Sequence, residues 1–208
     1  MSIFKSMVEL QHSFNQQIDK NYLEKNWNWN NAIIAESGEL LDSLGYKWWK
    51  KQEPDMENVK VEAIDLLHFV ISESIESDSF IVGANAGIHK TISNFTFWFS
   101  EFSYGKVNTN IKDLINALNY NQEDRFMIMK SIFNELDMSN KDVYIAYIVK
   151  NCLNKFRQDN GYKEGTYNKT WNGKEDNVIA YSLANELGAI DNLFEELYNK
   201  LNIYYIGE

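Results

Sequence analysis

The sequence predicts an all-α protein, a multi-helix bundle formed by a chain of 208 residues. Apolar residues recur at steps of three and four along most of the chain, which is the period of a helix with one buried face. The chain contains a single proline, a residue that breaks helix interiors. Hydrophobic residues make up 44% of the sequence, enough to fill a core without disulfides or membrane burial.

Three helices are predicted in the first part of the chain. They are expected over 4–18, over 33–44 with an end near Gly45, and over 57–77 after the loop marked by Pro54. The stripes that predict them are Phe4, Met7, Leu10, Phe14 and Ile18, then Ile33, Ser37, Leu40, Leu41 and Leu44, then Val61, Ile64, Leu67, His68, Ile71 and Ile75.

The segment 92–102 fits two structures. Phe95, Phe97 and Phe99 alternate as in a strand, whereas Phe95, Phe99 and Phe102 repeat as on a helix. We favour the helix, because neither a hairpin turn nor a partner strand flanks the segment.

The rest of the chain predicts further helices and one long loop. Two or three helices are expected within 111–157, with breaks near 119–122 and 138–141. A polar, glycine-containing loop is expected over 158–177, and loops of that length are usually functional or disordered. A last helix is expected over 183–201, with Asp176 or Asn177 placed to cap its start. We expect one domain over 1–208, with 78–150 as a helical subdomain or insertion.

The formal net charge of −10 argues against general binding to nucleic acid or anionic membranes, which both require basic surface. No apolar run approaches the 18 residues of a membrane span, and the first residues lack the pattern of a secretory signal. A single cysteine cannot form an internal disulfide, which suits a reducing compartment. These features predict a cytoplasmic protein.

Two pairs of carboxylates lie on helices that are otherwise apolar. Glu36 and Glu39 are three residues apart on one helix, and Glu62 and Asp65 are three apart on the next, so each pair shares a helix face. One interpretation is a solvated acidic face. The other is a site for Mg²⁺, with Mn²⁺ as a substitute, because both cations prefer oxygen ligands and both bind substrate phosphates.

The predicted polar loop and the residues before it carry a positive net charge, opposite in sign to the two pairs of carboxylates. Residues 150–174 contain six basic and two acidic residues, a net charge of +4, so the remainder of the chain carries −14. Amide and tyrosine side chains accompany these cations, and together they form a good clamp for anions. A flexible basic loop is the alternative interpretation.

Several motifs resemble the dimeric, all-α dUTPases, which are related to the MazG-type nucleotide pyrophosphohydrolases. The matching residues frame roughly 7–77 and 150–180, whereas 78–150 match only in helical character. They are Leu10-Gln11, Phe14-Asn15, Glu36-Ser-Gly-Glu39, Trp48-Trp49-Lys50, Glu62-Ala-Ile-Asp65-Leu-Leu-His68-Phe69, Asn154-Lys155-Phe156-Arg157, Asn160-Gly161-Tyr162, Tyr167, Lys169, Trp171, Gly173 and Glu175-Asp176-Asn177.

The resemblance implies the hydrolysis of dUTP to dUMP and pyrophosphate by a homodimer, with dUDP left open as a second substrate. Glu36, Glu39, Glu62 and Asp65 would then hold Mg²⁺ ions across the triphosphate, and Glu36 would also orient or deprotonate the attacking water. Gln11 and Asn15 would read the uracil edge, because an amide offers both a donor and an acceptor.

The remaining roles are also implied by the resemblance. Trp49, His68 and Phe69 would shape the pocket for the base and deoxyribose. The β- and γ-phosphates would be bound by Asn154, Lys155, Tyr162, Lys169 and Asn177. Arg157 is a further candidate there, or a structural residue at a helix end.

Two other functions fit the same sequence. One is a MazG-like pyrophosphohydrolase that acts on other or several nucleoside triphosphates, which uracil selectivity would distinguish from a dUTPase. The other is a non-catalytic helical interaction module, which would lack any Mg²⁺-dependent response to a non-hydrolysable dUTP analogue.

Overall fold

The computed structural model describes residues 3–100, 110–188, 190 and 192–206. The described residues fold into two compact units, one within 3–143 and the other within 144–206. Helix α7 (Asn140–Asp159) begins in the first unit and ends in the second.

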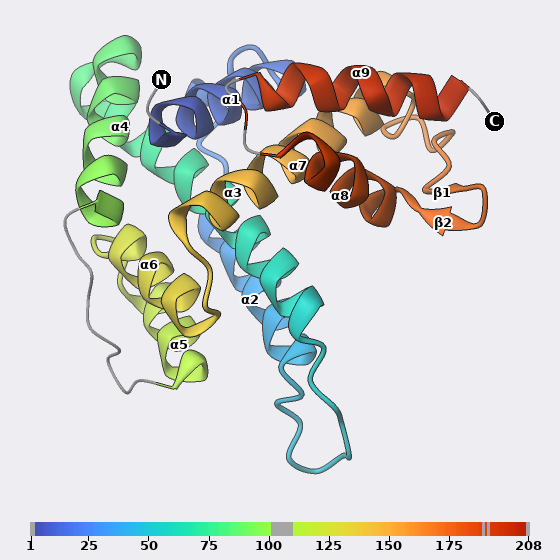
Figure 1. The fold of residues 1–208 in the computed structure, drawn as a ribbon. Helices are drawn as coiled ribbons and strands as arrows, with labels where there is room; N and C mark the ends of the chain where they lie inside the picture. Colours follow the sequence, from blue (N-terminus) through green and yellow to red (C-terminus); the bar gives the residue numbers. More distant parts are fainter. Residues whose placement is uncertain (1–2, 101–109, 189, 191, 207–208) are drawn as a thin grey trace. The chain divides into compact units, whose positions relative to one another are not determined.

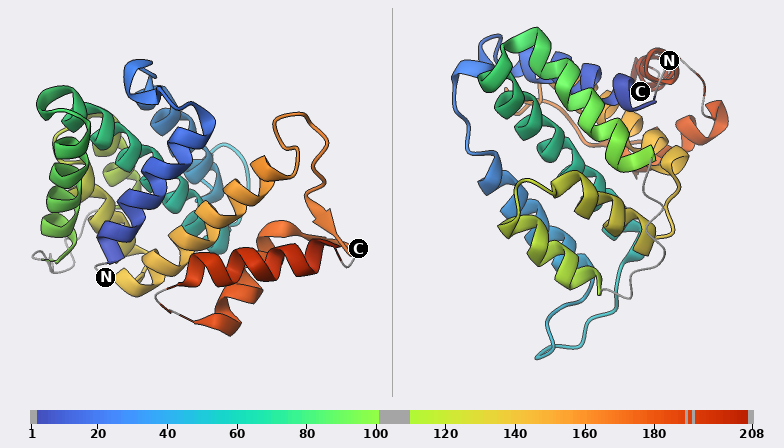
Figure 2. Two further views of the ribbon diagram at one scale, coloured as in Figure 1. Left: turned by 90° about the horizontal axis from the view of Figure 1, so that it is seen from above. Right: turned by 90° about the vertical axis from the view of Figure 1, so that its left-hand side faces the viewer.

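The first unit is built around α3, a helix of 27 residues. Its helices are α1 (Ile3–Ile18), α2 (Trp29–Ser43), α3 (Met56–Val82), α4 (Ala84–Ser100), α5 (Ile111–Tyr120) and α6 (Arg125–Glu135), with a 3₁₀ turn at Tyr22–Glu24. Helix α3 contacts α1, α2, α4 and α6, and α2 runs beside it (Figure 1). Helices α5 and α6 form a pair that contacts α2, α3 and α4 (Figure 2). The helical expectation for this part of the chain is therefore confirmed.

Local sequence signals explain where α2 and α3 begin. The side chain of Asn28 accepts a hydrogen bond from the backbone of Asn31, and that of Asp55 accepts one from Asn58. Both are N-caps that satisfy an amide left open by the first helical turn. Helix α3 continues five residues beyond the predicted end near Ser77, up to Gly83, whose φ of +87° suits glycine.

The ambiguous segment is helical through Ser100, and its predicted end at 101–102 lies outside the described residues. Phe95 and Phe99 are both buried, one helical turn apart, and each packs edge-on against Phe4 of α1 at 5.2 and 5.8 Å between ring centroids. Phe97 is half exposed on another face. The helical period therefore decides burial, and the strand-like alternation is incidental.

The second unit has one core that α7, α8 (Asp176–Leu187) and α9 (Leu193–Ile206) share with a small hairpin. Its buried residues are Val149, Cys152, Leu153, Phe156, Trp171, Ile179, Ala180, Ala184, Leu197 and Leu201. The single helix predicted over 183–201 is wrong, because Gly188, at φ +69°, ends α8 and α9 begins at Leu193. Apolar residues of both helices pack into the same core. The helical spacing of apolar residues therefore continues across the break, and this is why the sequence predicted a single helix.

The predicted loop over 158–177 also needs correction. Helix α7 extends to Asp159, and strands β1 (Thr170–Trp171) and β2 (Lys174–Glu175) pair antiparallel across Asn172-Gly173. Both turn residues have positive φ, as a two-residue hairpin turn with Asn-Gly requires. Glu175 takes the N-cap position of α8, one residue before the predicted caps. The Asn-Gly dipeptide was the sequence signal for this hairpin.

A buried ion pair joins helices of the first unit. Arg125, at the start of α6, is 2% exposed and donates to the carboxylate of Glu73 on α3 and to the side-chain oxygen of Asn30 on α2. Its Nε also donates to the carbonyl of Leu118 at 3.0 Å. Three neighbouring helices are thus held by one guanidinium.

We predict that Arg125→Ala lowers the free energy of unfolding by about 3–5 kcal/mol, because Glu73 would keep a partly buried charge without this partner. Denaturant unfolding followed by circular dichroism measures the change. Lys5→Ala is the control, since its pair with Glu9 is exposed and should contribute less than about 1 kcal/mol. Equal losses in the two variants would contradict the structural role of Arg125.

Candidate functional site

The predicted acidic residues meet where α2 and α3 run side by side. Carboxylate oxygens of Glu36, Glu62 and Asp65 lie within 4.8 Å of one another. Glu62 is buried, and the other two are half-buried. The structure therefore brings together three of the four predicted ligands from two helices.

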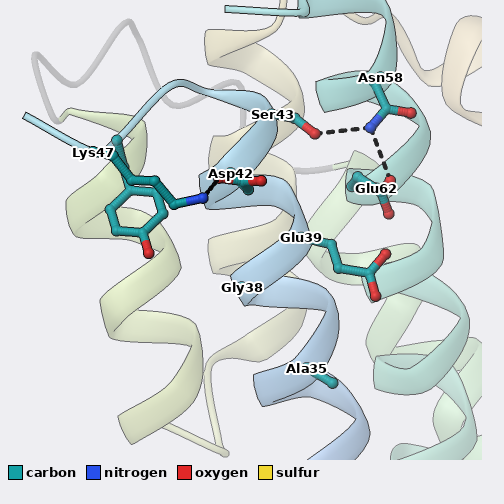
Figure 3. A pocket seen from close by; sticks show the side chains of 9 residues that line it. Ala35, Gly38, Glu39, Asp42, Ser43, Lys47, Asn58 and Glu62 are labelled. Carbon is teal, nitrogen blue, oxygen red and sulfur yellow. Dashed lines mark hydrogen bonds and ion pairs between the residues drawn. The ribbon is translucent and has the colours of Figure 1, made fainter. Parts of the chain in front are cut away.

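Glu39, the fourth predicted ligand, is exposed and does not belong to this group of three. It lies on α2, three residues after Glu36, and lines an open cleft of about 480 Å³ together with Glu62. Figure 3 shows Glu39 and Glu62 projecting from α2 and α3 into the space between the helices. The cleft is lined by Ala35, Gly38, Glu39, Asp42, Ser43, Tyr46, Lys47, Asn58 and Glu62.

Polar neighbours fix the carboxylate of Glu62. Asn58, one turn earlier on α3, donates from its side-chain amide to Glu62 Oε1 at 3.0 Å and to Ser43 Oγ at 2.8 Å (Figure 3). Lys47, the cation that lines the cleft, is paired with Asp42. The hydrogen bond from Asn58 holds the carboxylate of Glu62 in place, as hydrogen bonds from neighbouring residues do for the ligands of many metal sites.

The chemistry of the acidic group fits a divalent cation. Three carboxylates this close repel one another where they leave water, and either protons or cations must offset that repulsion. Hard oxygen donors are the ligands of Mg²⁺ and Mn²⁺. The close approach of the three carboxylates favours the metal-site interpretation over a dispersed acidic face, in which exposed carboxylates would spread apart.

A buried polar network joins α1 to α3. His68 Nδ1 lies 2.7 Å from Gln11 Oε1, Gln11 Nε2 donates to Asn15 Oδ1 at 3.0 Å, and Asn15 Nδ2 donates to Ser72 Oγ at 3.0 Å. All four residues are at most 6% exposed. Three predicted base-site residues are therefore in contact, although 57 positions separate Gln11 from His68.

The two aromatic residues predicted for the base pocket have different environments. Phe69 is half-buried on α3, with its ring centroid 6.4 Å from that of Trp29. Trp49 is 60% exposed in the loop after α2, where its ring contacts Tyr46 and Trp48. The structure therefore excludes a core role for Trp49.

The predicted phosphate-binding residues all belong to the second unit. Lys155 pairs with Asp159 at 2.6 Å and lies over the ring of Tyr198, whereas the exposed Lys169 lies 5.3 Å from the ring centroid of Tyr162. Asn154 is half-buried on α7. Asn177 is also half-buried, in the first turn of α8.

Arg157 is a structural residue. It is buried and donates to both carboxylate oxygens of Asp176 at 2.8 and 2.9 Å, which ties α7 to the start of α8. The hydroxyl of Tyr167 donates to the same carboxylate at 2.9 Å, and burial together with this bond raises the pKa of Tyr167. The sequence left two roles open for Arg157, and these bonds account for the structural one.

Sequence reasoning missed several polar residues on the face of α3 that carries the acidic pair. Ser72 is seven residues after Asp65, which is about two helical turns, and Glu76 is fourteen residues after Glu62, which is about four turns. Ser72 therefore lies on the same face of α3 as Asp65, and Glu76 on the same face as Glu62. Glu76 accepts from the indole of Trp29 at 2.9 Å, and burial raises its pKa. A search of α3 at steps of seven would have found both residues.

Comparison with known proteins identifies a family. The family described as dUTPase matches residues 3–162 of the chain. No curated protein matches the sequence significantly. The matched range includes 78–150, where the motifs showed only helical character, and it ends before Lys169 and Asn177.

We predict that Glu62→Gln raises the thermal midpoint in the presence of a chelator, by a few degrees, because it removes one of three repelling charges. The variant should also lose most of the stabilisation that Mg²⁺ gives the unsubstituted protein. Differential scanning fluorimetry with and without Mg²⁺ measures both effects.

Glu57→Gln is the matched control, since Glu57 is an exposed residue in the first turn of the same helix. Its Mg²⁺ response should equal that of the unsubstituted protein. An unchanged Mg²⁺ response in Glu62→Gln would exclude Glu62 as a ligand.

Proposed function

The chain belongs to the all-α dUTPase family and is a dUTP diphosphatase; from this premise we propose that it releases dUMP and pyrophosphate by using Mg²⁺ held between α2 and α3. The observation that carries the proposal is the convergence of Glu36, Glu62 and Asp65 from two helices. In this proposal Glu39, at the rim of the cleft, completes the ligand set as substrate enters.

The acidic residues would bind the cations and position them against the triphosphate. When bound, the cations supply positive charge that stabilises the charge developing on the transferring phosphoryl group. A carboxylate oxygen of Glu36 would orient the attacking water and accept its proton. This assignment is supported by the resemblance and by the place of Glu36 among the three carboxylates.

The base would lie against the network on α1 and α3. In this proposal Gln11 and Asn15 contact the uracil edge, His68 holds the amide of Gln11, and Phe69 and Trp49 flank the base and sugar. The support is the burial of both amides in a bonded network rather than on the surface. Rigid amides suit recognition of a base edge, because they lose little freedom on binding.

The phosphates distant from the sugar would be bound by Asn154, Lys155, Tyr162, Lys169 and Asn177. The proposal is supported by the net charge of +4 over 150–174 and by the donor chemistry of these side chains. Homodimer formation, a cytoplasmic location, Mn²⁺ as a substitute and dUDP as a second substrate stay predictions. Among the described helices, none has the length and apolar character needed to cross a membrane.

We predict that, in a panel of deoxynucleoside triphosphates with Mg²⁺, the protein releases pyrophosphate efficiently from dUTP alone. Glu36→Gln should lower kcat by about 10²–10⁴-fold, the usual range for loss of a general base. Pyrophosphate release measures both, and Glu57→Gln again serves as the control. Efficient cleavage of dCTP or dATP without dUTP would overturn the substrate assignment.

We also predict that Gln11→Ala lowers kcat/KM for dUTP by about tenfold or more, because the uracil edge would lose a buried hydrogen-bonding partner. Steady-state kinetics with dUTP and dCTP measures the change. Gln16→Ala is the matched control, since Gln16 is exposed on the same helix. A Gln11→Ala variant with unchanged selectivity would favour the relaxed, MazG-like alternative.

A further inference from the structure

The hydrogen bonds of the buried network around Gln11 can run from donor to acceptor in either of two directions. An amide is nearly symmetric in shape, so Gln11 and Asn15 could both turn over, with the imidazole of His68 changing its tautomer to match. Each amide presents a donor at one end and an acceptor at the other. Reversal would therefore exchange the donors and acceptors that the network offers to a ligand.

Ser72 distinguishes the two directions. It lies on α3 with no exposed surface, and its hydroxyl is 2.9 Å from the backbone carbonyl oxygen of His68, one turn earlier. A carbonyl can only accept, so the bond uses the single proton of the hydroxyl. Toward Asn15, Ser72 is then an acceptor: its Oγ lies 3.0 Å from Asn15 Nδ2, nearer than the 3.5 Å to Asn15 Oδ1.

The remaining bonds follow from this one. Asn15 turns its amino group to Ser72 Oγ, at 3.0 Å, and its oxygen to Gln11 Nε2, also at 3.0 Å. The oxygen of Gln11 therefore faces His68 Nδ1 at 2.7 Å, which assigns the proton to that nitrogen. In the reversed network the oxygen of Asn15 would face Ser72 Oγ, and Ser72 would have to abandon the backbone carbonyl to donate to it.

The direction matters for the choice of base. Uracil presents a ring N–H between two carbonyl oxygens, whereas cytosine presents a ring acceptor next to an amino group. An amide of fixed direction can match only one of these edges, and an amide free to reverse can match both. We propose that Ser72 is a positioning residue that fixes the direction of the Gln11–Asn15 amides and thereby selects uracil over cytosine; this inference rests on the proposed role of those amides.

The test compares kcat/KM for dUTP and dCTP in the full chain with Mg²⁺. Ser72→Ala should lower the dUTP/dCTP ratio by at least about tenfold, the effect of losing one buried hydrogen bond. Ser72→Thr keeps a hydroxyl that can bond the same carbonyl, so it should keep the ratio within about twofold. Ser77→Ala, on an exposed site of the same helix, should change nothing.

The outcomes separate the inference from the function on which it rests. Unsubstituted protein without a preference for dUTP would contradict the proposed base site itself. A clear preference that Ser72→Ala retains would overturn the role of Ser72, even if that variant were less stable.

If circular dichroism shows that Ser72→Ala is unfolded, Ser72→Cys replaces it, because a thiol is only a weak donor and acceptor. A lower ratio in Ser72→Cys than in Ser72→Thr supports the proposal. Equal ratios in these two variants refute it.

Discussion

The constraint on which the first unit depends is that α3 carries many carboxylates along an otherwise apolar core helix, and each must be compensated where it leaves water. Glu73 is bound by Arg125, Glu76 by the indole of Trp29, and Asp78 by Lys90 and Thr91. A guanidinium, an indole and an ammonium each offset the cost of desolvation. These contacts fix the neighbours of α3, since the partners come from α2, α4 and α6.

The acidic group near the start of α3 consists of three carboxylates that lie close to one another. Glu62 receives a hydrogen bond from the neutral amide of Asn58, and the carboxylates of Glu36 and Asp65 approach it within 4.8 Å. Farther along α3, Glu73 and Asp78 are each matched with a cationic side chain. Near the start of the helix three carboxylates lie close together, and their mutual repulsion is a physical reason that a divalent cation would stabilise this group.

The same helix also sets the distance between the acidic group and the amide network. Asp65 and Ser72 are separated by seven residues, about 10 Å along a helix. Because one continuous helix contributes residues to both sites, its backbone fixes the separation of Asp65 and Ser72. In the proposed function, a nucleotide would contact the network with its base and the cations with its phosphates. Its length would then have to match the distance between these two sites.

Sequence alone could predict the helices and the acidic pairs, since both depend on local spacing. It could not predict that Glu39 would lie outside the group of three, because side-chain approach depends on how α2 and α3 face each other. Apolar spacing also continued past Gly188, so only a glycine at positive φ marked the break between α8 and α9. The position of Ser72, seven residues after Asp65, could have been found from the sequence, but its role could not, because that role depends on its bonds to Asn15 of α1 and to the backbone of His68.

The basic segment of the second unit shows why charge counts overestimate the cations available to a substrate. Arg157 is bound by Asp176 in a buried, bidentate pair, and breaking such a pair leaves an uncompensated charge inside the protein. Lys155 and Asp159 are more exposed, with side chains 38% and 27% accessible, so exchanging that pair for a phosphate costs little. Lys169 is exposed and lies beside the ring of Tyr162, a contact that leaves its charge accessible to an anion. Phosphate binding in this unit should therefore depend on Lys155 and Lys169, while Arg157 holds the segment that presents them.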